Sequence, residues 1–166
     1  MNIINNKIKI RPRGILSELL KTQMNGLTGH IENAGFPFDR IWWGKNETQE
    51  KNENPQWWVY EQTAYWIDGF TRCAILSEDE RAIRRAEEII YSVITNPDSD
   101  GYLGPQTLKE TDGWNRWPHT VFFRACMALY DYNNDIKLLR ALTDHYLCGS
   151  VRHDKLRDIT NIEIML

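Results

Sequence analysis

The chain has 166 residues, of which 42% are hydrophobic, and this size and composition are typical of one globular domain. Its formal net charge is -3 and its lysines and arginines are scattered, which argues against a nucleic-acid-binding surface, because such a surface needs a concentrated basic patch. No apolar run approaches the roughly 20 residues of a membrane span, and the first 14 residues lack the continuous apolar core of a signal peptide. We therefore expect a cytoplasmic protein that contacts neither nucleic acid nor membrane.

The N-terminal part of the sequence predicts an arm followed by a helix. Residues 1–13 are expected to form the arm, and residues 14–166 a single helical domain. Over residues 14–33 the apolar side chains repeat at helical spacing, which predicts a first amphipathic helix. A long loop, residues 36–55, follows. The apolar stripe of the first helix consists of Ile15, Leu16, Leu19, Leu20, Met24, Leu27 and Ile31.

Residues 57–76 are the segment around which the rest of the chain is organised. They contain no proline, and their apolar side chains form two helical stripes on different sides, so little of the helix is left for water. Such a helix belongs in the interior of a larger assembly. Polar groups in a buried helix are unfavourable unless they are paired or face a polar cavity. We therefore predict that this helix forms a wall of a binding site, through Glu61, Gln62, Tyr65 and Asp68.

The pattern of a buried helix, a turn and a half-exposed helix occurs twice. Cys126 lies 53 residues after Cys73 (126 minus 73), and Asp135 lies 56 residues after Asp79 (135 minus 79). The sequence thus predicts an all-α fold of stacked antiparallel helical hairpins, separated by a loop over residues 96–105. A third unit begins at about Asp158. Because the sequence stops within an apolar pattern, we expect either truncation at residue 166 or a homodimer formed through the open helical end.

Three motifs in a fixed order carry a resemblance to a known family. They are WWVYEQTAYWIDGF at residues 57–70, DGYLGP at residues 100–105 and WPHTVFFRA at residues 117–125. Together they resemble the N-terminal hairpins of the bacterial beta-L-arabinofuranosidase family, which belongs to the six-hairpin glycosidases. The resemblance implies a partial (α/α)6 toroid, with the first helix of each hairpin lining a cavity and sugar bound at its mouth.

The resemblance implies a cofactor only for a longer protein. Members of the family that act on arabinofuranosides use a glutamate and a zinc-bound cysteine cluster, in which one cysteine is the nucleophile. Cys73, Cys126 and Cys148 have no close spacing, so neither zinc nor a nucleophile maps onto a residue of this sequence. Zinc is therefore expected only in a full-length parent. Within this chain we predict no metal site, and buried thiols are the simpler interpretation of the cysteines.

Glu61 and Asp68 are the best candidates for acids, although the sequence assigns no catalytic residue. Glu61 lies near the start of the central helix, where it could instead interact with the helix dipole, and Asp68 could instead pair with Arg72 at i+4. Seven residues of helix separate the two carboxylates by about 10 Å, slightly wide for a glycosidase pair.

The candidate substrate-binding residues are aromatic or hydrogen-bonding side chains at the starts of the two buried helices and in the loop between the hairpins. His119 could bind sugar hydroxyls or shuttle protons, but a capping or packing role competes. The full set is Trp58, Gln62, Tyr65, Tyr102, Gln106, Trp117 and His119.

The sequence favours the N-terminal part of a glycoside hydrolase that acts on a polysaccharide or oligosaccharide, an arabinofuranosidase by resemblance. We expect no activity from these 166 residues alone. A non-catalytic helical-repeat module that binds carbohydrate or protein is the alternative, and an epimerase or lyase on the same toroid is a third interpretation. Clustered cysteines and a glutamate downstream in the parent gene would favour the enzyme.

Overall fold

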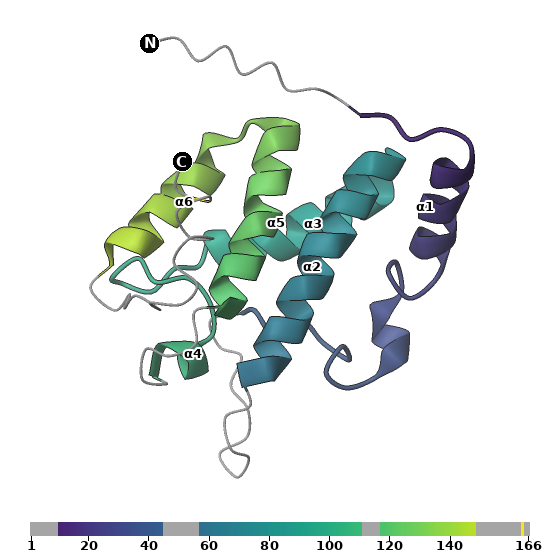
Figure 1. Cartoon of the computed structure of the whole chain (residues 1–166). Coiled ribbons are helices and arrows are strands. Elements are labelled where there is room, and N and C mark those ends of the chain that lie inside the picture. Colours follow the sequence, from purple (N-terminus) through teal and green to yellow (C-terminus); the bar gives the residue numbers. More distant parts are fainter. Residues whose placement is uncertain (1–9, 45–56, 111–116, 149–163, 165–166) are drawn as a thin grey trace, which may run out of the picture.

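Helices make up the regular structure of the described part of the chain. The computed structural model describes residues 10–44, 57–110, 117–148 and 164, and within these residues there is no strand (Figure 1). The predicted all-α class is confirmed. Most of the predicted arm and the third unit from Asp158 lie outside the described residues, although Ile164 is helical and buried. The helices are α1 (Ile15–Asn25), the 3-10 helix η1 (Ile31–Ala34), α2 (Trp57–Ser77), α3 (Glu80–Ile94), α4 (Gln106–Glu110), α5 (Trp117–Asn133) and α6 (Ile136–Leu147).

Helix α2 is the predicted central helix, with one residue more at its C-terminal end. The first of its two apolar stripes is almost completely buried, and in the second stripe Trp66 and Phe70 are buried as well. The helix therefore packs on more than one side, as its composition requires. The buried residues of the first stripe are Tyr60, Ala64, Ile67, Thr71 and Ala74.

The turns that follow α2 and α5 have the same local structure. Glu78 and Asn134 both have positive φ, 54° and 57°, and each is followed by an aspartate that caps the next helix. Asp79 accepts hydrogen bonds from two backbone N–H groups of α3, and Asp135 accepts one from the backbone of α6. A side-chain oxygen at this position accepts hydrogen bonds from N–H groups of the first helical turn, which have no acceptor within the helix. The local structure thus repeats at the 56-residue spacing that the sequence shows.

Helices α2 and α5 pack side by side and run in the same direction. Tyr65 contacts Trp117 and, three residues further along α2, Asp68 contacts Arg124 on α5, so the residue numbers rise together along the two helices. α3 packs on α2 and α6 packs on α5, while α3 also touches both α5 and α6 (Figure 1). The core lies between the pair α2 and α5 and the pair α3 and α6.

A tryptophan from the loop after η1 closes one side of the core. Trp43 is fully buried and stacks on Phe122 of α5, with ring centroids 4.3 Å apart. Its indole Nε1–H donates to the carbonyl oxygen of Tyr60 at 3.0 Å. This tryptophan thus ties the loop to both α2 and α5.

The first helix is shorter than predicted. α1 ends at Asn25, because the chain turns at Gly26 and passes so close to itself at Gly29 that a Cβ there would lie 1.9 Å from the carbonyl oxygen of Met24. The helix predicted over residues 14–33 is therefore wrong beyond Asn25. Much of its apolar stripe is exposed rather than packed. The exposed members are Ile15, Leu16, Leu19 and Leu27.

Within the described residues, no helix has the length and apolar character that crossing a membrane requires.

Candidate functional site

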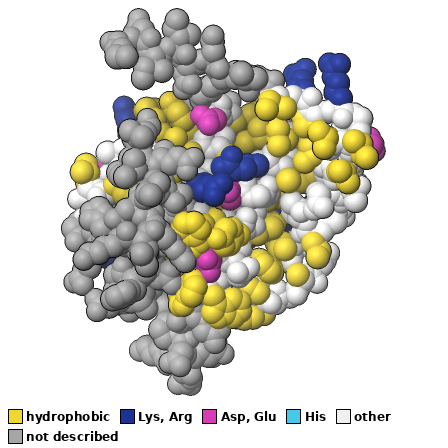
Figure 2. Space-filling model, viewed as in Figure 1, with side chains coloured by type: hydrophobic (Ala, Val, Ile, Leu, Met, Phe, Trp, Pro, Cys, Tyr) yellow, Lys and Arg dark blue, Asp and Glu magenta, His cyan; other side chains and the backbone are white. Residues whose placement is uncertain are grey.

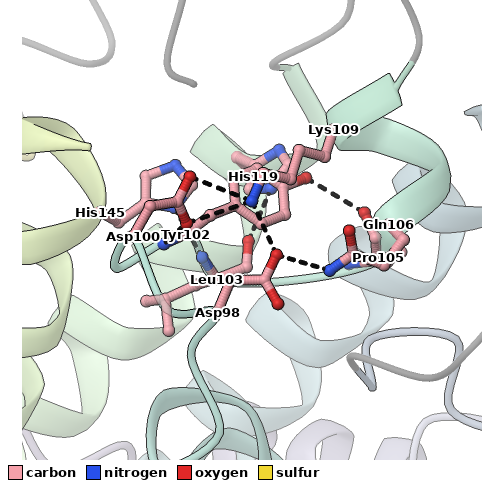
Figure 3. Close-up of polar contacts among 9 residues, drawn as sticks. All are labelled: Asp98, Asp100, Tyr102, Leu103, Pro105, Gln106, Lys109, His119 and His145. Carbon is pink, nitrogen blue, oxygen red and sulfur yellow. Dashed lines mark hydrogen bonds and ion pairs between the residues drawn. The ribbon is translucent and has the colours of Figure 1, made fainter. Parts of the chain in front are cut away.

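Two polar clusters contain most of the predicted site residues. We call the first the loop cluster, since it surrounds the loop between α3 and α4, and the second the helix face, since it lies along α2 and α5. The loop cluster consists of Asp98, Asp100, Tyr102, Gln106, Lys109, His119 and His145 (Figure 3). The helix face consists of Tyr65, Asp68, Gly69, Arg72, Trp117 and Arg124.

In the loop cluster two buried histidines hold one backbone unit. The N–H of Leu103 donates to Nδ1 of His145 at 2.9 Å, and Nε2 of His119 lies 2.9 Å from the carbonyl oxygen of Leu103 (Figure 3). A carbonyl oxygen only accepts, so Nε2 of His119 carries a proton. The two imidazole rings stack with centroids 5.0 Å apart. Both histidines therefore fix the loop against α5 and α6.

Lys109 holds the other part of the loop cluster. Its ammonium group lies 2.7 Å from Asp98 and 3.0 Å from Asp100, and the side chain of Gln106 also donates to Asp98 at 2.7 Å. Burial lowers the pKa of Lys109, but the hydrogen bonds and charges of the two aspartates outweigh it and raise this pKa above its usual value. The charged groups of this cluster are thus engaged with each other.

Three predicted substrate-binding residues lie together in this cluster, but their side chains form hydrogen bonds with groups of the loop itself. Tyr102 is buried, and its hydroxyl donates to the carbonyl oxygen of Pro105 at 3.1 Å. Gln106 bonds Asp98, and His119 bonds Leu103. These contacts fit the packing alternative for His119 that the sequence left open.

The helix face begins with two aromatic side chains that bridge α2 and α5. The indole Nε1–H of Trp117 donates to the hydroxyl of Tyr65 at 2.7 Å, and their ring centroids are 6.4 Å apart. Tyr65 is 43% exposed, and Trp117 is half-buried. Because the hydroxyl of Tyr65 accepts this hydrogen bond, its own proton remains available for a second one.

Further along the same face, Asp68 lies between two arginines. Nε of Arg72 donates to Oδ1 of Asp68 at 2.7 Å, and Nε of Arg124 lies 3.7 Å from Oδ2. The Arg72 pairing is the i+4 alternative that the sequence left open for Asp68. Both carboxylate oxygens of Asp68 therefore face arginines of the protein itself, one from α2 and one from α5.

Gly69 lies between the aromatic pair and the arginines. Residues 65, 69 and 72 of α2 are spaced at i, i+4 and i+7, so they share one side of the helix. Glycine inside a helix is less stable than alanine by about 0.5–1 kcal/mol. A Cβ at Gly69 would meet no atom within 4 Å, so packing inside the molecule does not require a glycine here. Gly69 is exposed and borders open space.

The remaining predicted residues lie near the start of α2. Gln62 is exposed, Glu61 is half-buried one turn before Tyr65, and Trp58 is half-buried with Phe36 edge-on to its ring at 5.6 Å. Figure 2 shows the surface of this side of the molecule, where Lys or Arg side chains adjoin an Asp or Glu side chain beside hydrophobic ones.

Arg124 and Gly69 were not predicted as site residues. Arg124 follows Asp68 by 56 residues (124 minus 68), the same spacing as the two capping aspartates, so the repeat itself could have placed the two side by side. Gly69 could have been noticed as a helix-destabilising residue within a strong helical pattern.

The described residues do not fit a zinc site. They include no group of three or more His, Cys, Asp or Glu side chains placed to hold a metal. All three cysteines are thiols rather than disulfides, and burial raises the pKa of Cys126 strongly. A thiol in such surroundings is not an activated nucleophile.

Comparison with models of known protein families, with curated proteins and with solved structures gives no match to this chain.

Proposed function

We propose that the helix face binds carbohydrate and forms one wall of the cavity of a glycoside hydrolase. The observation that carries this proposal is the half-exposed pair of Tyr65 and Trp117, joined by a hydrogen bond and followed along α2 by the exposed Gly69. Flat aromatic rings offer an apolar surface to the face of a sugar ring, while a phenol hydroxyl and nearby charged groups bond its hydroxyls.

The packing of the helices supports the toroid that this proposal includes. α2 and α5 lie parallel and adjacent, and each is followed after a short capped turn by a helix that packs back on it. In stacked helical hairpins, equivalent helices form continuous layers. We propose that α2 and α5 belong to the inner layer of an (α/α)6 toroid and that α3 and α6 belong to the outer layer.

Because no catalytic residue is assigned, a second candidate function is a helical module that binds carbohydrate without cleaving it. The observation that favours it is the position of Asp68, one of the two acid candidates, whose carboxylate oxygens both face arginines of the protein itself. Glu61 then remains as the acid candidate of the enzyme interpretation.

The experiment is a titration of the protein with neutral and acidic plant oligosaccharides, comparing the wild type with Tyr65→Ala. We expect the variant to lose about tenfold or more in affinity, because removing an aromatic anchor typically weakens binding by more than 1 kcal/mol. Tyr132→Ala is the matched control, since Tyr132 is similarly exposed, 47% against 43%, but lies at the other end of α5. No binding by the wild type, or equal binding by both variants, would reject the proposal.

Turnover distinguishes the two candidate functions. Since no activity is expected from these 166 residues alone, oligosaccharides that bind are incubated with the full-length product of the parent gene and with its Glu61→Gln variant, and the products are separated by chromatography. Cleavage by the wild type that Glu61→Gln abolishes supports the enzyme. Binding without cleavage supports the module.

A further inference from the structure

The charged part of the helix face carries two cations and one anion. The guanidinium groups of Arg72 and Arg124 both face the carboxylate of Asp68, and their side chains are 45% and 43% exposed, whereas that of Asp68 is 12% exposed. The buried carboxylate therefore compensates one positive charge, and one remains at the surface.

Both arginines are held in place by groups beneath them. Asp68 contacts the Nε atoms of both, and a terminal nitrogen of Arg72 also donates to the carbonyl oxygen of Arg124 at 3.3 Å. Within the described residues, the two terminal nitrogens of Arg124 have no hydrogen-bond or ion-pair partner. The half-exposed guanidinium of Arg124, whose Nε is in an ion pair, can therefore donate hydrogen bonds from its terminal nitrogens to an anion.

We propose that the helix face selects saccharides that carry a carboxylate, such as uronic acids, and that Arg72 and Arg124 bind this carboxylate. This inference rests on the proposed carbohydrate-binding function of the same face. The residual single positive charge matches a carboxylate better than a phosphate, which carries about -1.5 to -2 at neutral pH. Arginine forms paired, charge-assisted hydrogen bonds with carboxylates.

The position of the arginines relative to the aromatic pair fits an oligosaccharide rather than a single sugar. Tyr65 and Arg72 are seven residues apart on one side of α2, which corresponds to about 10 Å along the helix. One sugar ring would lie on Tyr65 and Trp117, and the carboxylate of the next ring would reach the arginines across Gly69. This arrangement explains why a side chain is absent at residue 69.

Three probes with different charged groups test the inference by calorimetric titration. They are an oligogalacturonate, the same oligosaccharide with its carboxylates methyl-esterified, and a sugar phosphate. We expect the oligogalacturonate to bind about tenfold or more tightly than the ester, since hydrogen bonds to a charged group are stronger than those to a neutral one. Added salt should reduce this difference.

Arg124→Gln should remove most of the preference for the acid, so that acid and ester bind with similar affinity. Arg140→Gln on α6 is the control and should keep the preference, because Arg140 is exposed and lies on a different helix. Equal binding of acid and ester by the wild type would overturn the inference while the proposed function stands. Preference for the phosphate over the carboxylate, or failure of all three probes, would overturn it as well, and only failure of the neutral oligosaccharides in addition would reject the proposed function.

Discussion

The loop cluster and the helix face contain similar residue types but differ in where their hydrogen bonds go. In the loop cluster, Lys109 is shared by two aspartates, and His119 and His145 both bond the backbone of Leu103. On the helix face, two half-exposed arginines share one carboxylate, and the terminal nitrogens of Arg124 have no partner among the described residues.

Under the proposed function, this difference separates a cluster that stabilises the fold from one that also binds a ligand. Buried polar groups are unfavourable unless their hydrogen bonds are satisfied, and in the loop cluster the protein satisfies them with its own loop. On the helix face the arginines link α2 to α5 but stay half-exposed. We therefore expect substitutions near the loop cluster to change stability and substitutions on the helix face to change ligand affinity.

The largest expected effect on stability is that of Trp43→Ala, because this tryptophan lies between the loop cluster and the core. It is fully buried, stacks on Phe122 and packs edge-on to His119. Replacing a buried tryptophan by alanine lowers the free energy of unfolding by about 3–5 kcal/mol. Urea denaturation measures the loss. Trp57→Ala, at an exposed position of α2, should change the free energy of unfolding by about 0.5 kcal/mol or less. Similar losses for the two variants would contradict the packing described here.

Gly104→Ala should lower stability next most, through the loop that the two histidines hold. Gly104 has φ of 108°, and a Cβ there would lie 3.1 Å from Nε2 of His119 and 3.2 Å from the ring of Trp43. We expect a loss of about 1–3 kcal/mol in urea denaturation, from backbone strain and from the displaced rings. Gly14→Ala separates these causes, because Gly14 also has positive φ but no neighbour within 4 Å. An equal loss of stability for Gly14→Ala would mean that contact with the rings does not contribute to the loss for Gly104→Ala.

Gly69→Ala should have the opposite effect on stability. A Cβ at this position meets no other atom, so we expect a gain of about 0.4–1 kcal/mol in the free energy of unfolding, from the lower entropy of the unfolded chain. The same methyl group would project between Tyr65 and Arg72 on the proposed binding face, so oligosaccharide affinity should fall. Thermal unfolding and titration are measured on one sample. A gain in stability with unchanged affinity would show that the ligand does not approach α2 here.

The smallest effect is expected for Lys109→Met, and it depends on pH. The aspartates raise the pKa of Lys109 above its ordinary value of 10.5, so its ion pairs contribute stability below that pH and lose this contribution as the pH rises through the raised pKa. The wild type should therefore be slightly more stable than the variant at neutral pH, and the difference should shrink in strongly alkaline solution. A difference that grows with pH would contradict this account of the loop cluster.

Much of the fold could be predicted from local patterns. The two-sided apolar pattern of α2 and the aspartates that cap α3 and α6 depend on neighbouring residues in the sequence, and the structure agrees with them. The early end of α1 could not be foreseen, because it depends on the close approach of Gly29 to Met24 rather than on periodicity. α4 has only five residues, too few for a periodic signal.

The candidate site was predictable in part. Tyr65 and Trp117 were both identified as binding residues from their positions near the starts of two buried helices, and the structure brings them together. The roles of Tyr102 and His119 depend on where the loop folds back, which no local pattern records. The pairing of Asp68 with Arg124 depends on the parallel register of α2 and α5.

The most direct test of carbohydrate binding by the helix face is an NMR titration of the isotopically labelled wild type with oligogalacturonate. We predict that the largest shift changes will occur at the indole N–H of Trp117, at the backbone of Gly69 and at the side-chain Nε–H groups of Arg72 and Arg124, while Leu103 and Lys109 in the loop cluster remain unchanged. Shift changes confined to the loop cluster would contradict the account.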